Sequence, residues 1–252
     1  MGALWVWVSV LFFITLQLGL EVGSRLGKRR AEEPNKGTDA VASIVYGLLT
    51  LLLSFSFSLA VARFDARRHI IVDEANSVGT AYLRLDLLPE PSQPSLKAAF
   101  VRYTDARLAF NNALSNGTDP SASLKTTGEE QVVIWTKAMS AYRTDPHEST
   151  RIQLTPALNE MFDLAAARSE AVETRVPWII FLLLASVSLA SSLLIGKALA
   201  PRPTRSWGYR LIFSVVVVFV SYVIADLDDP RQGLIRINDS DKILREIRST
   251  MH

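Results

Sequence analysis

An apolar run from Val41 to Ala62 leads, without a proline or a turn signal, into a charged stretch that ends at Leu88. A helix needs about 20 apolar residues to cross the hydrocarbon core of a bilayer, and this run is long enough to do so. The charged stretch keeps a helical pattern of polar and apolar positions until Pro89-Glu90-Pro91, which must end the helix. The pattern predicts one long helix that begins in a membrane and continues into water.

Three other stretches are also apolar enough to be spans: Leu4–Leu20, Trp178–Ile195 and Leu211–Ala225. The first stretch has neither the basic start nor the small-residue end of a signal peptide, so we expect it to be a retained span. The region between spans two and three shows no strand-like alternation and predicts helices over about 95–114, 128–142 and 155–175. We therefore predict an all-α, four-transmembrane-helix membrane protein with a helical extramembrane domain between spans two and three.

The predicted spans and their flanks divide the chain into four parts. These are a transmembrane hairpin over 1–62 (spans about 4–22 and 41–62), a helical extramembrane domain over 63–177 that continues span two, a second transmembrane hairpin over 178–225 (spans about 178–196 and 208–225), and a polar C-terminal tail over 226–252. Residues 235–247 of the tail have the pattern of a short amphipathic helix. The two short connectors carry more Lys and Arg than the other flanks, which favours an orientation with both connectors inside.

The composition excludes several classes of function. The chain has 27 basic and 25 acidic residues, and the basic residues gather near the apolar segments, which gives no support for nucleic-acid binding. It contains no Cys, and its three His residues are far apart, so no ligand set for a metal can be recognised. Phosphate-binding, dinucleotide-binding, metalloprotease and serine-hydrolase motifs do not occur. We predict a multi-pass integral membrane protein that contacts lipid, with no cofactor, no metal and no enzymatic activity.

Small and hydroxyl-bearing side chains recur along span two at helical spacing, which places them on one face of the helix. They are Ser43, Gly47, Thr50, Ser54 and Ser58. Such a stripe is typical of a tight helix–helix contact, in which small residues let two backbones approach, and it also suits the wall of a water-filled path. Span three carries a second stripe, formed by Ala185, Ser188, Ser192 and Gly196, and we expect the two stripes to pack on each other.

Charged residues of both signs follow span two immediately, and Glu74 lies further along the same predicted helix. One interpretation is a solvated collar just outside the membrane; the other is a network that pairs charges between neighbouring helices or subunits. The sequence alone leaves both interpretations open. In the next predicted helix, the residues that share one face are Phe100, Tyr103, Arg107 and Phe110.

Span two and its extension carry a resemblance to a known family. The matching segments are Leu53–Arg68, Val72–Arg84 and Leu87–Pro91. Together with the four-span layout and the long helical insert, they resemble a bacterial family of unknown function that is described as bestrophin-like. This family is distantly similar to the bestrophin anion channels, because the run from Ala62 to Arg67 is similar to the Ala-Arg-aromatic…Glu-Ala-Arg run that follows the pore helix there.

Bestrophins are pentameric anion channels in which the second span lines the pore and apolar side chains form its neck. The resemblance therefore implies a homo-oligomeric ion channel, a pentamer by analogy, that carries small inorganic anions such as chloride across a bacterial inner (plasma) membrane. It implies that span two lines the pore, with candidates Thr50, Ser54, Phe55, Phe57 and Ser58, and that a charged collar at the pore mouth is formed by Arg63, Asp65, Arg67, Arg68 and Glu74. It also implies a cytoplasmic helical insert, opposite to the orientation that the charge count favours.

A second hypothesis remains beside the channel. The protein would be a membrane-anchored sensor or scaffold whose helical domain, over about 92–177, binds a ligand or a partner, while the spans only anchor it. The channel hypothesis predicts a closed ring of copies around span two. The sensor hypothesis predicts a monomer or a dimer.

Overall fold

The structure of the chain is a computed structural model, and it describes residues 2–29, 36–144, 147–174, 176–200, 206–228 and 241–251. Within these ranges the ordered elements are all helices and no strand is present, so the predicted all-α class is confirmed. The chain forms two compact units. Unit 1 consists of Met1–Phe64 and Arg175–Leu234, and unit 2 consists of Asp65–Thr174 and Ile235–His252.

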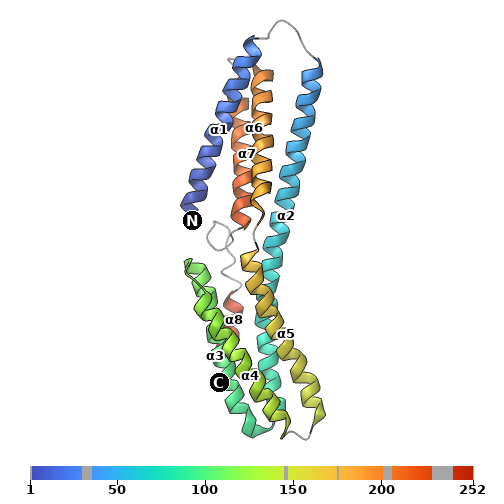
Figure 1. Cartoon of the computed structure of the whole chain (residues 1–252), viewed down its shortest axis with the longest axis vertical. Helices are drawn as coiled ribbons and strands as arrows, with labels where there is room; N and C mark the ends of the chain where they lie inside the picture. Colours follow the sequence, from blue (N-terminus) through green and yellow to red (C-terminus); the bar gives the residue numbers. More distant parts are fainter. Residues whose placement is uncertain are drawn as a thin grey trace. The chain divides into compact units, whose positions relative to one another are not determined.

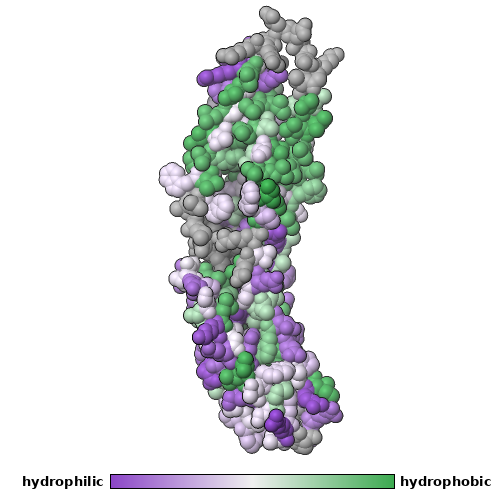
Figure 2. Space-filling model, in the orientation of Figure 1, coloured by the Kyte–Doolittle hydropathy of each residue, from purple (hydrophilic) through white to green (hydrophobic). Residues whose placement is uncertain are grey.

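Unit 1 contains the apolar helices. They are α1 (Gly2–Arg29), the first part of α2 (Lys36–Leu83), α6 (Trp178–Leu199) and α7 (Ser206–Asp228) (Figure 1). Each of these four helices is long and apolar enough to cross a membrane. Figure 2 shows apolar residues gathered over this unit. The four predicted spans are therefore present as helices in the structure.

The closest helix pair in unit 1 is α1 with α6, and it is built on glycines. A Cβ atom on Gly23 would overlap the carbonyl oxygen of Leu193, and one on Gly196 would overlap the carbonyl oxygen of Leu20. Backbones can approach this closely only where side chains are missing, which is the usual basis of helix association in a bilayer. The prediction that the stripe of span three packs on span two is therefore wrong: Gly196 packs on α1. The matching signal in α1, glycine at every fourth position through Gly19, Gly23 and Gly27, was missed.

Unit 2 is a helical bundle with an apolar core. Its elements are the remainder of α2, the short 3₁₀ helices η1 (Arg84–Leu87) and η2 (Glu90–Ser92), α3 (Gln93–Asn116), α4 (Ser121–Tyr142), α5 (Glu148–Glu173) and α8 (Asp241–Ser249). Each α-helix contributes buried side chains, such as Val78, Phe100, Ile134, Leu158 and Leu244. The buried side chains of α2 hold the long helix in this core by burial of apolar surface, which is the main stabilising term in water.

Two helices of unit 2 begin earlier than the sequence predicts. α4 begins at Ser121 rather than near Gly128, because Pro120 ends the preceding turn and the backbone N–H of Ser121 donates to the carboxylate of Asp119 at 3.0 Å. α5 begins at Glu148, so that Pro156 lies inside the helix instead of at its start. Pro156 removes one helical hydrogen bond, and the buried side chains of the surrounding turns keep the helix continuous.

The C-terminal helix α8 docks on α3 and on the extension of α2. Leu244 and Met251 are buried, and the guanidinium of Arg248 donates to both carboxylate oxygens of Asp105, at 2.7 and 3.1 Å. The predicted tail helix over 235–247 is thus realised from Asp241 onward. The first part of that range, up to residue 240, lies outside the described residues.

Candidate functional site

Only one face of the apolar part of α2 is covered by the other helices of unit 1. Ala42, Leu49 and Ala60 are buried on that face, and Leu49 packs with Leu16 of α1 and Val217 of α7. The successive spacings of seven and eleven residues keep these positions on one side of a helix. Large apolar side chains on other faces of α2 stay exposed among the described residues.

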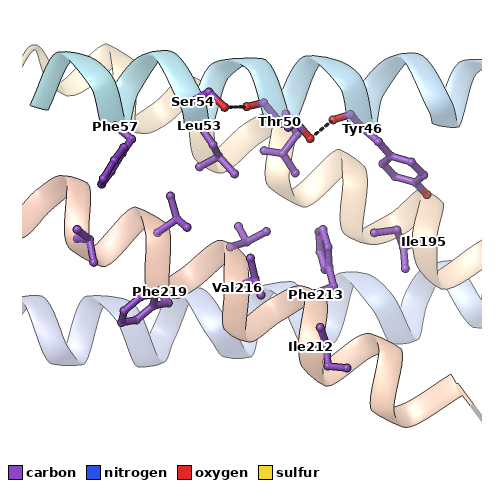
Figure 3. Close-up of a pocket in the computed structure, with 14 residues that line it drawn as sticks. Tyr46, Thr50, Leu53, Ser54, Phe57, Ile195, Ile212, Phe213, Val216 and Phe219 are labelled. Atoms are coloured by element: carbon purple, nitrogen blue, oxygen red, sulfur yellow. Dashed lines mark hydrogen bonds between the residues drawn. The ribbon is translucent and has the colours of Figure 1, made fainter. Parts of the chain in front are cut away.

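The small and hydroxyl stripe of α2 lies on the uncovered surface. All of its members, Ser43, Gly47, Thr50, Ser54 and Ser58, are exposed. The hydroxyl of Thr50 donates to the carbonyl oxygen of Tyr46 at 2.9 Å, and that of Ser54 donates to the carbonyl oxygen of Thr50 at 2.8 Å (Figure 3). These two hydroxyls are therefore satisfied by their own helix. No described atom lies within 4 Å of a Cβ added at Gly47, so the stripe makes no close helix contact at this position.

The predicted pore-lining residues divide between two sides of α2. Thr50, Ser54 and Phe57 line a groove of about 910 Å³ between α2 and α7 (Figure 3). Phe55 and Ser58 do not line this groove, and the Phe55 side chain is 65% exposed. Side chains two residues apart on a helix point about 160° away from each other, which follows from 3.6 residues per turn. Phe55 and Phe57 therefore cannot both face one central axis.

The charged residues that follow the apolar run have different surroundings. Asp65 and Arg68 are exposed, and Arg63 is half-buried in unit 1. Arg67 instead binds the C-terminal end of α5, because its guanidinium donates to the carbonyl oxygens of Ala171 at 3.2 Å and Thr174 at 2.7 Å. A cation at the C-terminus of a helix is favoured by unpaired carbonyl groups and by the helix dipole.

Glu74 is not part of a solvated collar: its side chain is fully buried inside unit 2. One carboxylate oxygen accepts from Nε of Arg107 on α3 and the other from Nη1 of Arg168 on α5, both at 2.5 Å. The placement of Glu74 at a pore mouth is corrected accordingly. For this residue the structure shows the other predicted arrangement, a network that pairs charges between neighbouring helices.

The network around Glu74 extends to two further contacts. Arg168 also donates to the side-chain oxygen of Asn111 at 2.5 Å, and the guanidinium of Arg107 lies 4.6 Å from the ring centre of Phe110. Burial opposes ionisation of Glu74, but the charges and hydrogen bonds of Arg168 and Arg107 outweigh it, and the pKa of Glu74 lies below its ordinary value. Burial raises the pKa of the nearby Tyr103 phenol.

Sequence reasoning missed the partners of Glu74. The available signal was Arg107, a charged residue among the apolar positions that α3 turns toward the core. Arg168 on α5 gave no comparable signal, because the residue is separated from Glu74 by 94 positions. Among the described residues, no group of three or more His, Cys, Asp or Glu side chains is placed to hold a metal ion.

Four membrane-length apolar helices together with a helical unit define the class: this is an integral membrane protein with an all-α fold. A family model, the bestrophin-like domain, matches residues 7–241. The chain therefore belongs to the bestrophin-like family. No protein of curated function is detectably similar to it in sequence.

Several solved structures share this fold. A bacterial bestrophin homolog from Klebsiella pneumoniae is 16% identical, with a TM-score of 0.70 over 98% of this chain and 99% of that chain. A point variant described as the same homolog gives a TM-score of 0.70 at 16% identity over 96% of both chains, and a variant described as a membrane protein gives 0.71 at 16% over 98% of this chain and 97% of that chain. At this identity the likeness establishes the fold.

Proposed function

We propose that the protein is one subunit of an oligomeric ion channel, permeable to anions, in which α2 lines a shared central pore. The observation that carries the proposal is the uncovered face of α2 at membrane depth, on which Phe55 is 65% exposed and Leu51 is 50% exposed. Membership of the bestrophin-like family supports a channel, and analogy with the bestrophins supports a ring of copies, a pentamer, around α2.

The proposal assigns the pore to the side of α2 that carries Phe55 and Ser58. A ring of aromatic side chains at Phe55 would form an apolar constriction, which gates by excluding water, and the Ser58 hydroxyls one turn further would contact permeating ions. Arg63 and Arg68, which follow on the same helix, would favour anions at the mouth by their charge. Thr50, Ser54 and Phe57 are assigned to the groove beside α7 and not to the pore.

The proposed location is the inner membrane of a bacterium. The helices that would cross the membrane are α-helical spans, whereas proteins of the bacterial outer membrane are β-barrels. The solved structures with the same fold include a bacterial homolog. Lipid and further copies of the chain are the proposed partners, and chloride is the first ion to test.

Ion flux into liposomes, measured with matched chloride and gluconate gradients, tests this function. Phe55→Ala widens the proposed constriction and should raise chloride flux about tenfold, because hydrophobic gating depends on the width and polarity of the narrowest ring. Phe57→Ala removes the same volume from the other side of α2 and should leave flux within about twofold of the unmodified protein. Equal effects of the two substitutions would place the pore elsewhere.

Native mass spectrometry of the detergent-solubilised protein tests the ring itself. A pentamer or a similar closed ring is expected. A monomer or a dimer would leave no room for a shared pore and would favour a sensor or scaffold whose helical unit binds a ligand or partner.

A further inference from the structure

The charge network inside unit 2 leaves most of one guanidinium without a hydrogen-bond acceptor. Arg107 on α3 is fully buried, and its Nε donates to the carboxylate of Glu74 at 2.5 Å. Its two terminal nitrogens, Nη1 and Nη2, are also buried, and neither has a hydrogen-bond partner among the described residues. These two nitrogens carry four of the five N–H groups of the side chain. An unpaired donor inside a protein is costly, and the cost is larger when the donor belongs to a charged group.

The positive charge of Arg107 is also only partly balanced. Glu74 is the one acidic residue that forms an ion pair with Arg107 among the described residues. The second oxygen of the same carboxylate accepts from Arg168 at 2.5 Å, so Arg107 does not have the full negative charge to itself. A buried charge is stable only when it is both paired and hydrogen-bonded. The surroundings of Arg107 therefore favour a further negative charge.

The neighbours of Arg107 on its own helix do not supply that charge. One turn further along α3, the ring of Phe110 lies 4.6 Å from the central carbon of the guanidinium. An aromatic ring attracts a cation through its face but does not neutralise it. One turn earlier, the hydroxyl of Thr104 donates to the carbonyl oxygen of Phe100 at 2.8 Å. The partner of the terminal nitrogens is therefore expected to come from solution.

An anion suits these donors better than water does. Water accepts hydrogen bonds but brings no net charge, whereas the attraction between opposite charges is stronger in a buried site than in solvent. The two terminal nitrogens of a guanidinium form a fork whose N–H groups bind an anion together. The cost of removing an ion from water rises steeply with its charge, so a small monovalent anion is favoured over a divalent one.

We propose that unit 2 binds a small monovalent anion, chloride or another halide, at the terminal nitrogens of Arg107. The anion accepts the N–H groups that Glu74 leaves unpaired, and the two together balance the guanidinium charge. The site lies inside unit 2 and not on the surface of α2 that the channel proposal assigns to the pore, so it goes beyond ion conduction. A ligand that binds only the folded state makes the stability of that state depend on the ligand concentration. The stability of unit 2 should therefore depend on the halide concentration.

Thermal unfolding of the full-length protein in detergent tests the site. Sodium chloride and sodium bromide are compared with sodium gluconate at the same ionic strength, because gluconate is too large for a buried site. At a halide concentration about ten times its dissociation constant, the midpoint should rise by about 3–5 °C. Arg107→Gln should abolish this rise. Arg102→Gln is the matched control, because it removes a 51% exposed guanidinium from the same helix, and it should keep the rise.

X-ray diffraction from crystals of the unmodified protein grown in sodium bromide locates the ion even if Arg107→Gln does not fold. An anomalous bromine peak at hydrogen-bond distance from Nη1 or Nη2 of Arg107 is expected. No peak at Arg107 would overturn the proposal.

Two outcomes of the unfolding experiment would also overturn it. Equal midpoints in halide and gluconate would mean that water satisfies the donors. A halide effect that persists in Arg107→Gln would mean that the anion binds elsewhere in the chain. The oligomeric mass and the ion flux of the unmodified protein report on the channel proposal alone.

Discussion

Units 1 and 2 hold their helices together in different ways, although α2 contributes to both. In unit 1, the closest contact between helices rests on shape: glycines let α1 and α6 touch backbone to backbone, while the hydroxyls of Thr50 and Ser54 bond within their own helix. In unit 2, Glu74 of α2 is buried and bound by arginines from two other helices, inside an apolar core.

The difference follows from the solvent that each unit is built for. Lipid tails are as apolar as leucine, so packing of small residues replaces the hydrophobic effect as the source of helix association. In water, burial of apolar surface supplies most of the stability, and a charge can be buried only if it is fully paired.

The largest effect is expected at the buried charge network. Glu74→Gln keeps the size of the side chain but removes the negative charge between Arg107 and Arg168, and breaking a buried pair costs about 3–5 kcal/mol. Hydrogen–deuterium exchange of the solubilised protein should show faster exchange in α3 and α5.

The control for that experiment is the partly exposed pair of Glu130 with Arg102, which has an Nε–Oε1 distance of 2.7 Å and side chains that are 14% and 51% exposed. Glu130→Gln should cost less, about 1 kcal/mol, because water reaches the half-exposed arginine and screens the pair. If both substitutions changed exchange equally, the buried network would have no special role in unit 2.

The glycine contact of unit 1 should give the next largest effect. At a helix position where the added methyl group meets no other atom, replacing Gly by Ala stabilises the folded protein by up to about 1 kcal/mol. Gly208→Ala should follow this rule, because nothing lies within 4 Å of the added Cβ. Gly23→Ala should instead destabilise by about 1–3 kcal/mol, because the Cβ meets the carbonyl of Leu193 and the helices must separate. Thermal unfolding in detergent compares the two, and the same sign for both would refute the close α1–α6 contact.

Acid should weaken unit 2 through Glu74. Because the pKa of this carboxylate in the folded protein is below its ordinary value of 4.5, the ionised group stabilises the fold above that pH. The stabilisation is lost as the pH falls below 4.5 through the folded pKa. The stability deficit of Glu74→Gln, measured by denaturant unfolding at pH 7 and again near pH 3, should therefore shrink in acid; a deficit that stayed constant would contradict the assignment.

The smallest effect is expected on the stripe of α2. Thr50→Ala and Ser54→Ala remove exposed hydroxyls that bond only to their own helix, so each should change stability by no more than about 0.5 kcal/mol. Thermal unfolding again provides the measurement. A larger loss in the assembled protein would mean that the stripe is buried between copies.

Much of the fold was predictable because its signals are local. An apolar run of membrane length must become a helix, since every backbone polar group has to be satisfied within the segment. Pro89 and Pro91 predicted that the helix ends after Leu88; the α-helix stops at Leu83, and the 3₁₀ helix η1 continues it to Leu87. The start of α4 was predicted too late because Gly128 was taken as a boundary. Gly128 lies inside the helix, where the packing of α4 outweighs the low helix propensity of glycine.

The candidate site was less predictable, because its meaning depends on neighbours far away in the sequence. The stripe of α2 was recognised as a special face, but the periodicity of one helix does not show which helix, lipid or pore faces it. The family resemblance named both Phe55 and Phe57 as pore candidates, and only the position of α7 separates them. Glu74 looked like a member of a solvated cluster until its partners on α3 and α5 were placed.

By itself, the sequence determined the membrane segments, the all-α class and the long helix that joins the two units, since these follow from the hydrophobicity and backbone chemistry of neighbouring residues. The tertiary structure alone decided that α1, and not α2, is the close partner of α6, that the stripe of α2 stays exposed among the described residues, and that Glu74 is buried between Arg107 and Arg168. Contacts of this kind depend on the fit of surfaces between residues remote in the chain, and no local pattern of residues specifies that fit.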